Sequence, residues 1–114
     1  MKILCITQYD DKVINGVSKE AIVLGQELSE KLNGTLSLIT FNESAATELQ
    51  KYHSNEVILV NDSNLDDYNP LYYTETINHV INKESFDLIL IGLTINPPPF
   101  LKIILLNPPY VAAI

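Results

Sequence analysis

The chain has 114 residues and a formal net charge of -7, from 14 acidic and 7 basic side chains. That length suits one domain, and a hydrophobic content of 46% is enough for a core without crosslinks. All basic residues are lysines, so the chain lacks the guanidinium group that binds phosphate and guanine through paired hydrogen bonds. Its excess negative charge also repels a polyanion, and we therefore expect no nucleic-acid partner.

The N-terminal residues argue against a targeting segment. Ile3 to Ile6 form an apolar run of only four residues, which is too short for the core of a signal peptide. The acidic Asp10 and Asp11 that follow are unlike a transit peptide. No stretch approaches the ~18 uncharged apolar residues of a membrane span. These features predict a soluble cytoplasmic protein that is not embedded in a membrane.

Cys5 is the only cysteine and lies inside the first apolar run. A single cysteine excludes an internal disulfide and is typical of a protein in a reducing compartment. We expect a small buried strand residue there and not a reactive thiol.

The first apolar run, residues 2–7, is typical of a strand that is covered on both faces. A polar connection follows it, and Ser18 is a plausible N-cap for a helix over residues 17–33. Apolar residues recur in this helix at spacings of three and four. Asn33 and Gly34 favour the left-handed backbone conformation that ends a helix.

Residues 35–41 form the second predicted strand. Apolar residues at helical spacing over 44–52 predict a helix of about two turns. A third strand is expected over 56–60, and the polar residues 61–67 then read as a surface loop.

The third helix has a clear start signal at Asn69 and Pro70, because asparagine caps helices and proline suits the first helical position. Its apolar face predicts a helix that runs to about Glu84. The β-rich run 87–92, closed by Gly92, is the fourth predicted strand.

The alternation of four apolar strands with three helices predicts a three-layer, doubly wound α/β fold with a parallel sheet. The expected strand order is 3-2-1-4. Ligands in such sheets bind beyond the carboxyl ends of the strands, where the order reverses. The candidate crevice therefore lies at residues 8–11 and 92–95.

The tail over residues 95–114 differs from the rest of the chain in composition. Its apolar run, 100–106, reads either as a short strand or as a short helix, and it leaves open whether a fifth strand joins the sheet. If exposed, this run would be a site of aggregation or dimerisation. Five prolines interrupt the tail: Pro97, Pro98, Pro99, Pro108 and Pro109.

Gly92-Leu93-Thr94 lies where backbone amides and a hydroxyl could hold a phosphate or a ribose. No G-x-G-x-x-G and no Walker A motif occurs, so a glycine that simply ends the strand is the favoured interpretation.

The other polar candidates have ordinary surface explanations. We expect His53 and His79 at the surface, with His79 paired to Glu75 on one helix face, because neither has further ligands at metal-binding spacing. The adjacent carboxylates Asp10-Asp11 and Asp66-Asp67 are interpreted as solvated loops. A tyrosine cluster at Tyr68, Tyr72 and Tyr73 serves equally well as a contact surface or as helix packing.

Residues 1–94 resemble the N-terminal domain of the electron transfer flavoprotein alpha subunit, which has the fold of adenine-nucleotide alpha hydrolases. The resemblance is carried by Met1-Lys2-Ile3-Leu4, the helix 27–32 with Asn33-Gly34, the stretch 51–60, Asn61-Asp62, Tyr68-Asn69-Pro70 and the stretch 86–94. It departs after Thr94, where the family continues into a basic helix and this chain has the proline-rich tail.

The resemblance implies a scaffold domain of a heterodimeric electron carrier, not an enzyme, with a beta subunit as partner. Dehydrogenases such as those for acyl-CoA and a quinone reductase would be its indirect partners. The family binds FAD mainly in a separate C-terminal domain, which this truncated chain lacks. We therefore assign no catalytic, cofactor-binding or metal residues and do not expect the chain to bind FAD alone. The alternatives are a small adenine-nucleotide-binding module of the same fold and a free-standing interaction domain.

Overall fold

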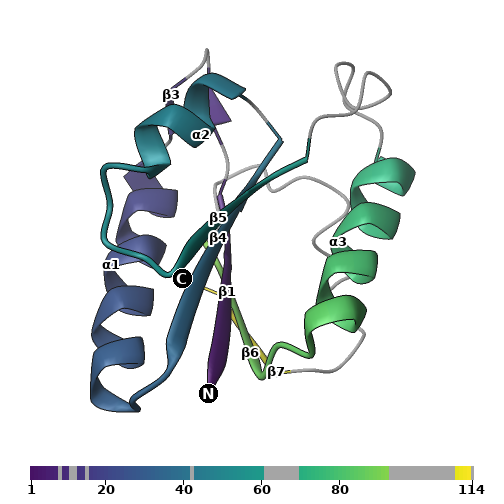
Figure 1. Cartoon of the computed structure of the whole chain (residues 1–114). Coiled ribbons are helices and arrows are strands. Elements are labelled where there is room, and N and C mark those ends of the chain that lie inside the picture. Colours follow the sequence, from purple (N-terminus) through teal and green to yellow (C-terminus); the bar gives the residue numbers. More distant parts are fainter. Residues whose placement is uncertain are drawn as a thin grey trace.

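The computed structural model describes residues 1–7, 9–10, 13–14, 16–41, 43–60, 70–92 and 110–113. A central sheet separates two helical layers, with α1 and α2 on one face and α3 on the other (Figure 1). This arrangement confirms the predicted three-layer α/β fold. Within the described part of the chain, no helix is long and apolar enough to cross a bilayer.

The main sheet has five parallel strands in the order β5-β4-β1-β6-β7. The first four in that order confirm the predicted 3-2-1-4 arrangement. The fifth strand comes from the end of the tail and pairs with β6, whereas the apolar run 100–106 lies outside the described residues. The strands are β1 (Lys2–Ile6), β4 (Thr35–Thr40), β5 (Glu56–Leu59), β6 (Leu88–Ile91) and β7 (Tyr110–Ala113).

The helices in the described part of the chain are α1 (Gly16–Lys31), α2 (Glu43–Leu49) and α3 (Pro70–Glu84). The predicted start of α3 at Pro70 is confirmed, while Asn69 and the polar segment before it lie outside the described residues. The end of α3 at Glu84 is also as predicted, whereas the ends of α1 and α2 differ from the predictions by one to three residues, which is ordinary for element boundaries.

Alternate side chains of β1, β4 and β6 fill two separate cores, because successive residues of a strand point to opposite faces. Ile3 and Cys5 of β1 join the core under α1 and α2, together with Ile14, Ala21, Ile22, Leu36, Leu38, Ala45, Leu49 and Leu90. Leu4 and Ile6 join the core under α3, together with Ile39, Ile77, Ile81, Phe86, Ile89 and Ile91. Burial on both faces explains why β1 and β6 are nearly continuous apolar runs.

The first helix begins two residues before the predicted N-cap. Ser18 lies inside the first turn of α1 and is fully buried, so its assignment as the cap is wrong. At the other end, Asn33 takes a φ of 50°, and the amides of Asn33 and Gly34 donate to the carbonyls of Glu30 and Ser29. This is a Schellman motif with asparagine in the left-handed position. Gly34 itself has no positive φ, so the prediction that it shares this role is wrong.

The segment after β1 contains a small antiparallel ribbon that the sequence did not indicate. Its strands are β2 (Tyr9–Asp10) and β3 (Val13–Ile14), with Tyr9 opposite Ile14 and Asp10 opposite Val13. Ile14 is only 2% exposed and packs into the core under α1. Ile14 thus anchors the connection between β1 and α1 to this core.

Lys2 links β1 to the turn between α3 and β6. Its Nζ donates to the Glu84 carbonyl at 2.6 Å and lies 5.3 Å from the centre of the Phe86 ring. The backbone amides of Lys2 and Asp87 donate to the Asp87 carboxylate and the Lys2 carbonyl, each at 2.8 Å. A cation at the end of α3 also complements the negative end of the helix dipole.

Candidate functional site

The candidate site is the carboxyl edge of the sheet between β1 and β6, where the strand order reverses. Its described parts are Thr7, Gly92 and the first turn of α1. The predicted residues Gln8, Asp11 and 93–95 lie outside the described residues, so Thr94 cannot be placed. Asp10 is the second residue of β2.

Thr7 holds the ends of β1 and β4 together. Its hydroxyl and its amide both donate to the Ile39 carbonyl, at 2.7 and 3.2 Å, and the residue is 3% exposed. The hydroxyl proton is therefore used inside the protein, and only the oxygen lone pairs of Thr7 remain for a ligand.

Gly92 packs directly against the first turn of α1. A Cβ at this position would lie 2.6 Å from Val17 Cγ1 and 2.7 Å from the Val17 carbonyl carbon and oxygen. These distances are far below van der Waals contact, so only glycine fits here without a shift of the backbone. Close packing of the strand against the helix is one reason for a glycine at position 92, directly after β6.

Cys5 is the one described group near this edge with a resolved change of acidity. The residue is fully buried in β1, and desolvation raises the pKa of its thiol from 9.0 to about 12. A neutral thiol without solvent access is a poor nucleophile. The prediction of a buried structural cysteine is confirmed.

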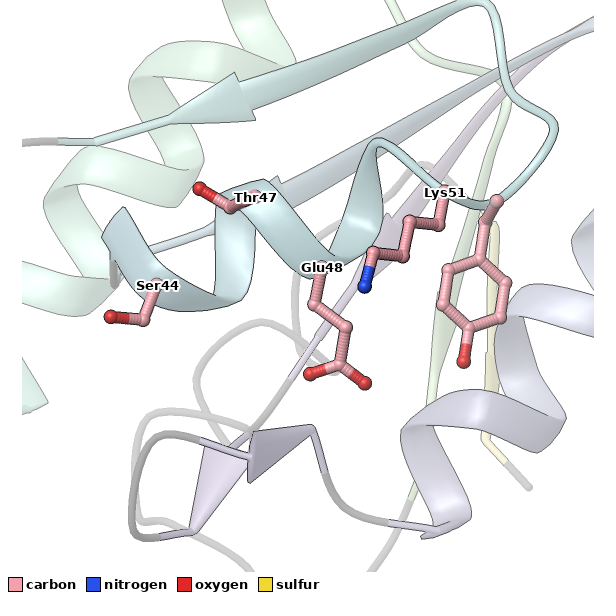
Figure 2. A pocket seen from close by; sticks show the side chains of 5 residues that line it. Ser44, Thr47, Glu48 and Lys51 are labelled. Atoms are coloured by element: carbon pink, nitrogen blue, oxygen red, sulfur yellow. The ribbon is translucent and has the colours of Figure 1, made fainter.

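A hollow of about 460 Å³ lies beside α2. Figure 2 shows the side chains of Glu48, from α2, and Lys51, from the turn after α2, extending toward the same open space. Lys19 Nζ of α1 lies 3.9 Å from the Glu48 carboxylate and so bridges the two helices. The lining residues are Ser44, Thr47, Glu48, Lys51 and Tyr52.

A second cavity, of about 520 Å³, opens between the C-terminal half of α1 and the residues before β5. Several of its polar groups are engaged with each other. Gln26 Nε2 donates to the His53 carbonyl at 3.1 Å, and Asn55 Oδ1 accepts from the Leu36 amide at 2.8 Å. The lining residues are Gln26, Ser29, Glu30, Gly34, Leu36, His53, Ser54 and Asn55.

The two histidines do not form a common site. His53 is exposed beside the second cavity, while His79 is exposed on α3, on the opposite face of the sheet. Glu75 is also exposed, but it forms no ion pair with His79, so the predicted pairing is wrong. Among the described residues, no three acidic, histidine or cysteine side chains converge as a metal site would require.

The remaining candidates cannot be placed. Asp66, Asp67 and Tyr68 lie outside the described residues. Tyr72 and Tyr73 belong to α3, whose described side chains in this region begin at Glu75.

Comparison with known families gives one match that covers most of the chain. The family model described as the electron transfer flavoprotein domain matches residues 3–96. A search of curated proteins finds no match.

Proposed function

The chain belongs to the electron transfer flavoprotein domain family, and we propose that it is an alpha-subunit-like scaffold domain of a heterodimeric electron carrier. One observation carries the proposal: the matched residues, 3–96, extend from β1 to just beyond β6. They therefore include four adjacent strands of the sheet and the three described helices.

In this proposal residues 1–94 act through protein contacts, and FAD is bound by other parts of the carrier. At the switch point, Gly92 packs directly against Val17 in the first turn of α1. We derive no redox step in this chain.

The proposed partner is a beta subunit of the same family, in the cytoplasm. Acyl-CoA-type dehydrogenases would supply electrons to the assembled carrier, and a quinone reductase would accept them. In this scheme the chain catalyses no reaction. Its contribution is to hold a fixed surface on which the subunit that carries electrons can dock.

Titration with FAD tests the scaffold role. The purified chain should show no saturable quenching of flavin fluorescence up to concentrations well above those of ordinary cofactor sites. Tight binding by the isolated chain would overturn the proposal. Size-exclusion chromatography with a beta subunit of the family should then give a heterodimer peak, and separate elution at concentrations of tens of micromolar would overturn the assigned partner.

A second candidate is a small adenine-nucleotide-binding module. It is favoured by the position of the first turn of α1, which lies beside the ends of β1 and β6. The amides of a helix N-terminus attract phosphate. Calorimetry with AMP and with ATP separates the two functions, since saturable heat is expected only from the nucleotide-binding module.

A further inference from the structure

We propose that Asn33-Gly34 is a site of spontaneous deamidation that the folded end of α1 keeps unreactive, so that modification requires this end of the helix to open. In the reaction, a bond forms between the Gly34 nitrogen and Asn33 Cγ, and the bond from Cγ to Nδ2 breaks. Ammonia leaves with the proton of the glycine amide, and water then opens the cyclic imide to give aspartate or isoaspartate. Glycine favours the reaction because it has no side chain to hinder the approach. This chemistry concerns the end of α1 and is independent of the proposed function.

The turn between α1 and β4 favours this chemically labile pair for reasons of conformation and packing. Asn33 has a φ of 50°, a conformation that asparagine adopts more readily than most residues. Gly34 has no positive φ, but a Cβ there would overlap the Met1 carbonyl oxygen and would lie 3.2 Å from the carbonyl carbon. The same Met1 oxygen accepts a hydrogen bond from the Thr35 amide at 2.9 Å, which fixes the position of the clash. The fold therefore accounts for both members of the pair.

The nucleophile of the reaction is held by the helix cap. The Gly34 amide donates to the Ser29 carbonyl at 2.8 Å. Its lone pair is delocalised into the peptide bond, so the nitrogen must lose its proton before it can attack. The hydrogen bond retains that proton and points the nitrogen toward the helix. Asn33 itself is exposed, so water reaches its side chain, and the glycine nitrogen is the partner that the fold protects.

Either product would disfavour closing of the helix end again. An aspartate at position 33 adds a negative charge just beyond the C-terminus of α1, where the helix dipole is also negative and where Glu30 is exposed. An isoaspartate lengthens the backbone by one methylene, which displaces the Gly34 amide from the Ser29 carbonyl. The modification therefore records earlier openings of this end of the helix.

Peptide mass spectrometry measures the reaction after incubation at mildly alkaline pH, in buffer and in guanidinium chloride. Cleavage after lysine places the pair in residues 32–51 and the other Asn-Gly pair of the chain, Asn15-Gly16, in residues 13–19. Asn33 should react at least about tenfold more slowly in buffer than in denaturant, where the two pairs should react at similar rates. Equal rates for Asn33 in buffer and in denaturant would refute protection by the fold. An unreactive Asn33 in denaturant would refute the site itself.

Two variants of α1 test the helix end as the gate without altering the reacting atoms. Leu28→Ala truncates a partly buried side chain that packs against the core under α1 and α2. It should raise the rate at Asn33 in buffer several-fold, because the last turns open more often. Val23→Ala, at a position 47% exposed on the same helix, is the matched control and should leave the rate unchanged. Circular dichroism verifies that both variants are folded, and equal rates in the two folded variants would refute the gate. The comparison between buffer and denaturant uses the unaltered chain and decides the protection without them.

Discussion

Gly92 at the end of β6 lies so close to Val17 in the first turn of α1 that a Cβ would come within 2.6 Å of the valine side chain and 2.7 Å of its carbonyl. At this point the first turn of α1 packs directly against the backbone of Gly92, because glycine has no side chain to separate the helix from the strand. This contact joins the start of α1 to the switch point of the sheet, the edge at which ligands of doubly wound folds bind.

Gly92→Ala should destabilise the fold by about 1–3 kcal/mol, because α1 must shift to accept the methyl group. Gly16→Ala is the matched control, since a Cβ at Gly16 meets nothing within 4 Å. It should leave stability nearly unchanged or slightly raised. Urea denaturation followed by circular dichroism measures both. Equal midpoints for the two variants would contradict the close contact at Gly92.

Lys2→Met should lower the free energy of unfolding by about 1 kcal/mol, because it removes the Nζ donor of the Glu84 carbonyl and the cation near Phe86. Lys83→Met is the control. Lys83 lies in the last turn of the same helix but makes no hydrogen bond or ion pair among the described residues. It should cost only the few tenths of a kcal/mol due to the helix dipole. A similar loss of stability in both variants would show that Lys2 stabilises the fold only through the helix dipole.

The sequence predicted the sheet well because burial on both faces leaves a continuous apolar signal in β1 and β6. It missed the ribbon of β2 and β3, since strands of two residues have no periodicity to detect. The contact between Gly92 and Val17 could not be predicted either. The two residues are 75 positions apart in the sequence, and only the packing of α1 on β6 brings them together.

Ser18 shows how tertiary packing overrides a local rule. Serine before an apolar face is the favoured N-cap, but this side chain is 0% exposed and already inside α1. The candidate site was limited in the same way. The expected strand order was enough to locate the switch point. The hydrogen bond from the Thr7 hydroxyl to the Ile39 carbonyl was not predictable, because it depends on the register between β1 and β4.

The Cys5 thiol should make the fold less stable at high pH. Burial raises its pKa from 9.0 to about 12, so above pH 9 the unfolded chain releases a proton that the folded chain retains. The free energy of unfolding should then fall by about 1.4 kcal/mol per pH unit from this group between pH 9 and 12. Cys5→Ala removes this contribution. Denaturation at pH 8, 9 and 10 should show a shallower decline for the variant, and parallel declines would contradict the raised pKa.

Asn55 and Leu36 exchange two hydrogen bonds that fix the start of β5 beside β4. The Leu36 amide donates to Asn55 Oδ1 at 2.8 Å, and the Asn55 amide donates to the Leu36 carbonyl at 2.9 Å. Asn55→Ala should cost about 1–3 kcal/mol, because it leaves the buried Leu36 amide without its acceptor. Asn55→Asp keeps an acceptor oxygen and should retain most of the stability. If both variants unfold at the same denaturant concentration, the side-chain bond contributes little.

Deleting residues 110–114 tests what β7 contributes to the sheet. The truncated chain should lose on the order of 1–2 kcal/mol, because the ladder bonds to β6 are partly offset by the entropy of ordering the strand. Its solubility should also fall, since the apolar β6 becomes an uncovered edge. Deleting Ile114 alone leaves β7 intact and is the control. Greater solubility with unchanged stability after the longer deletion would show that the tail is an aggregation site and not part of the folded sheet.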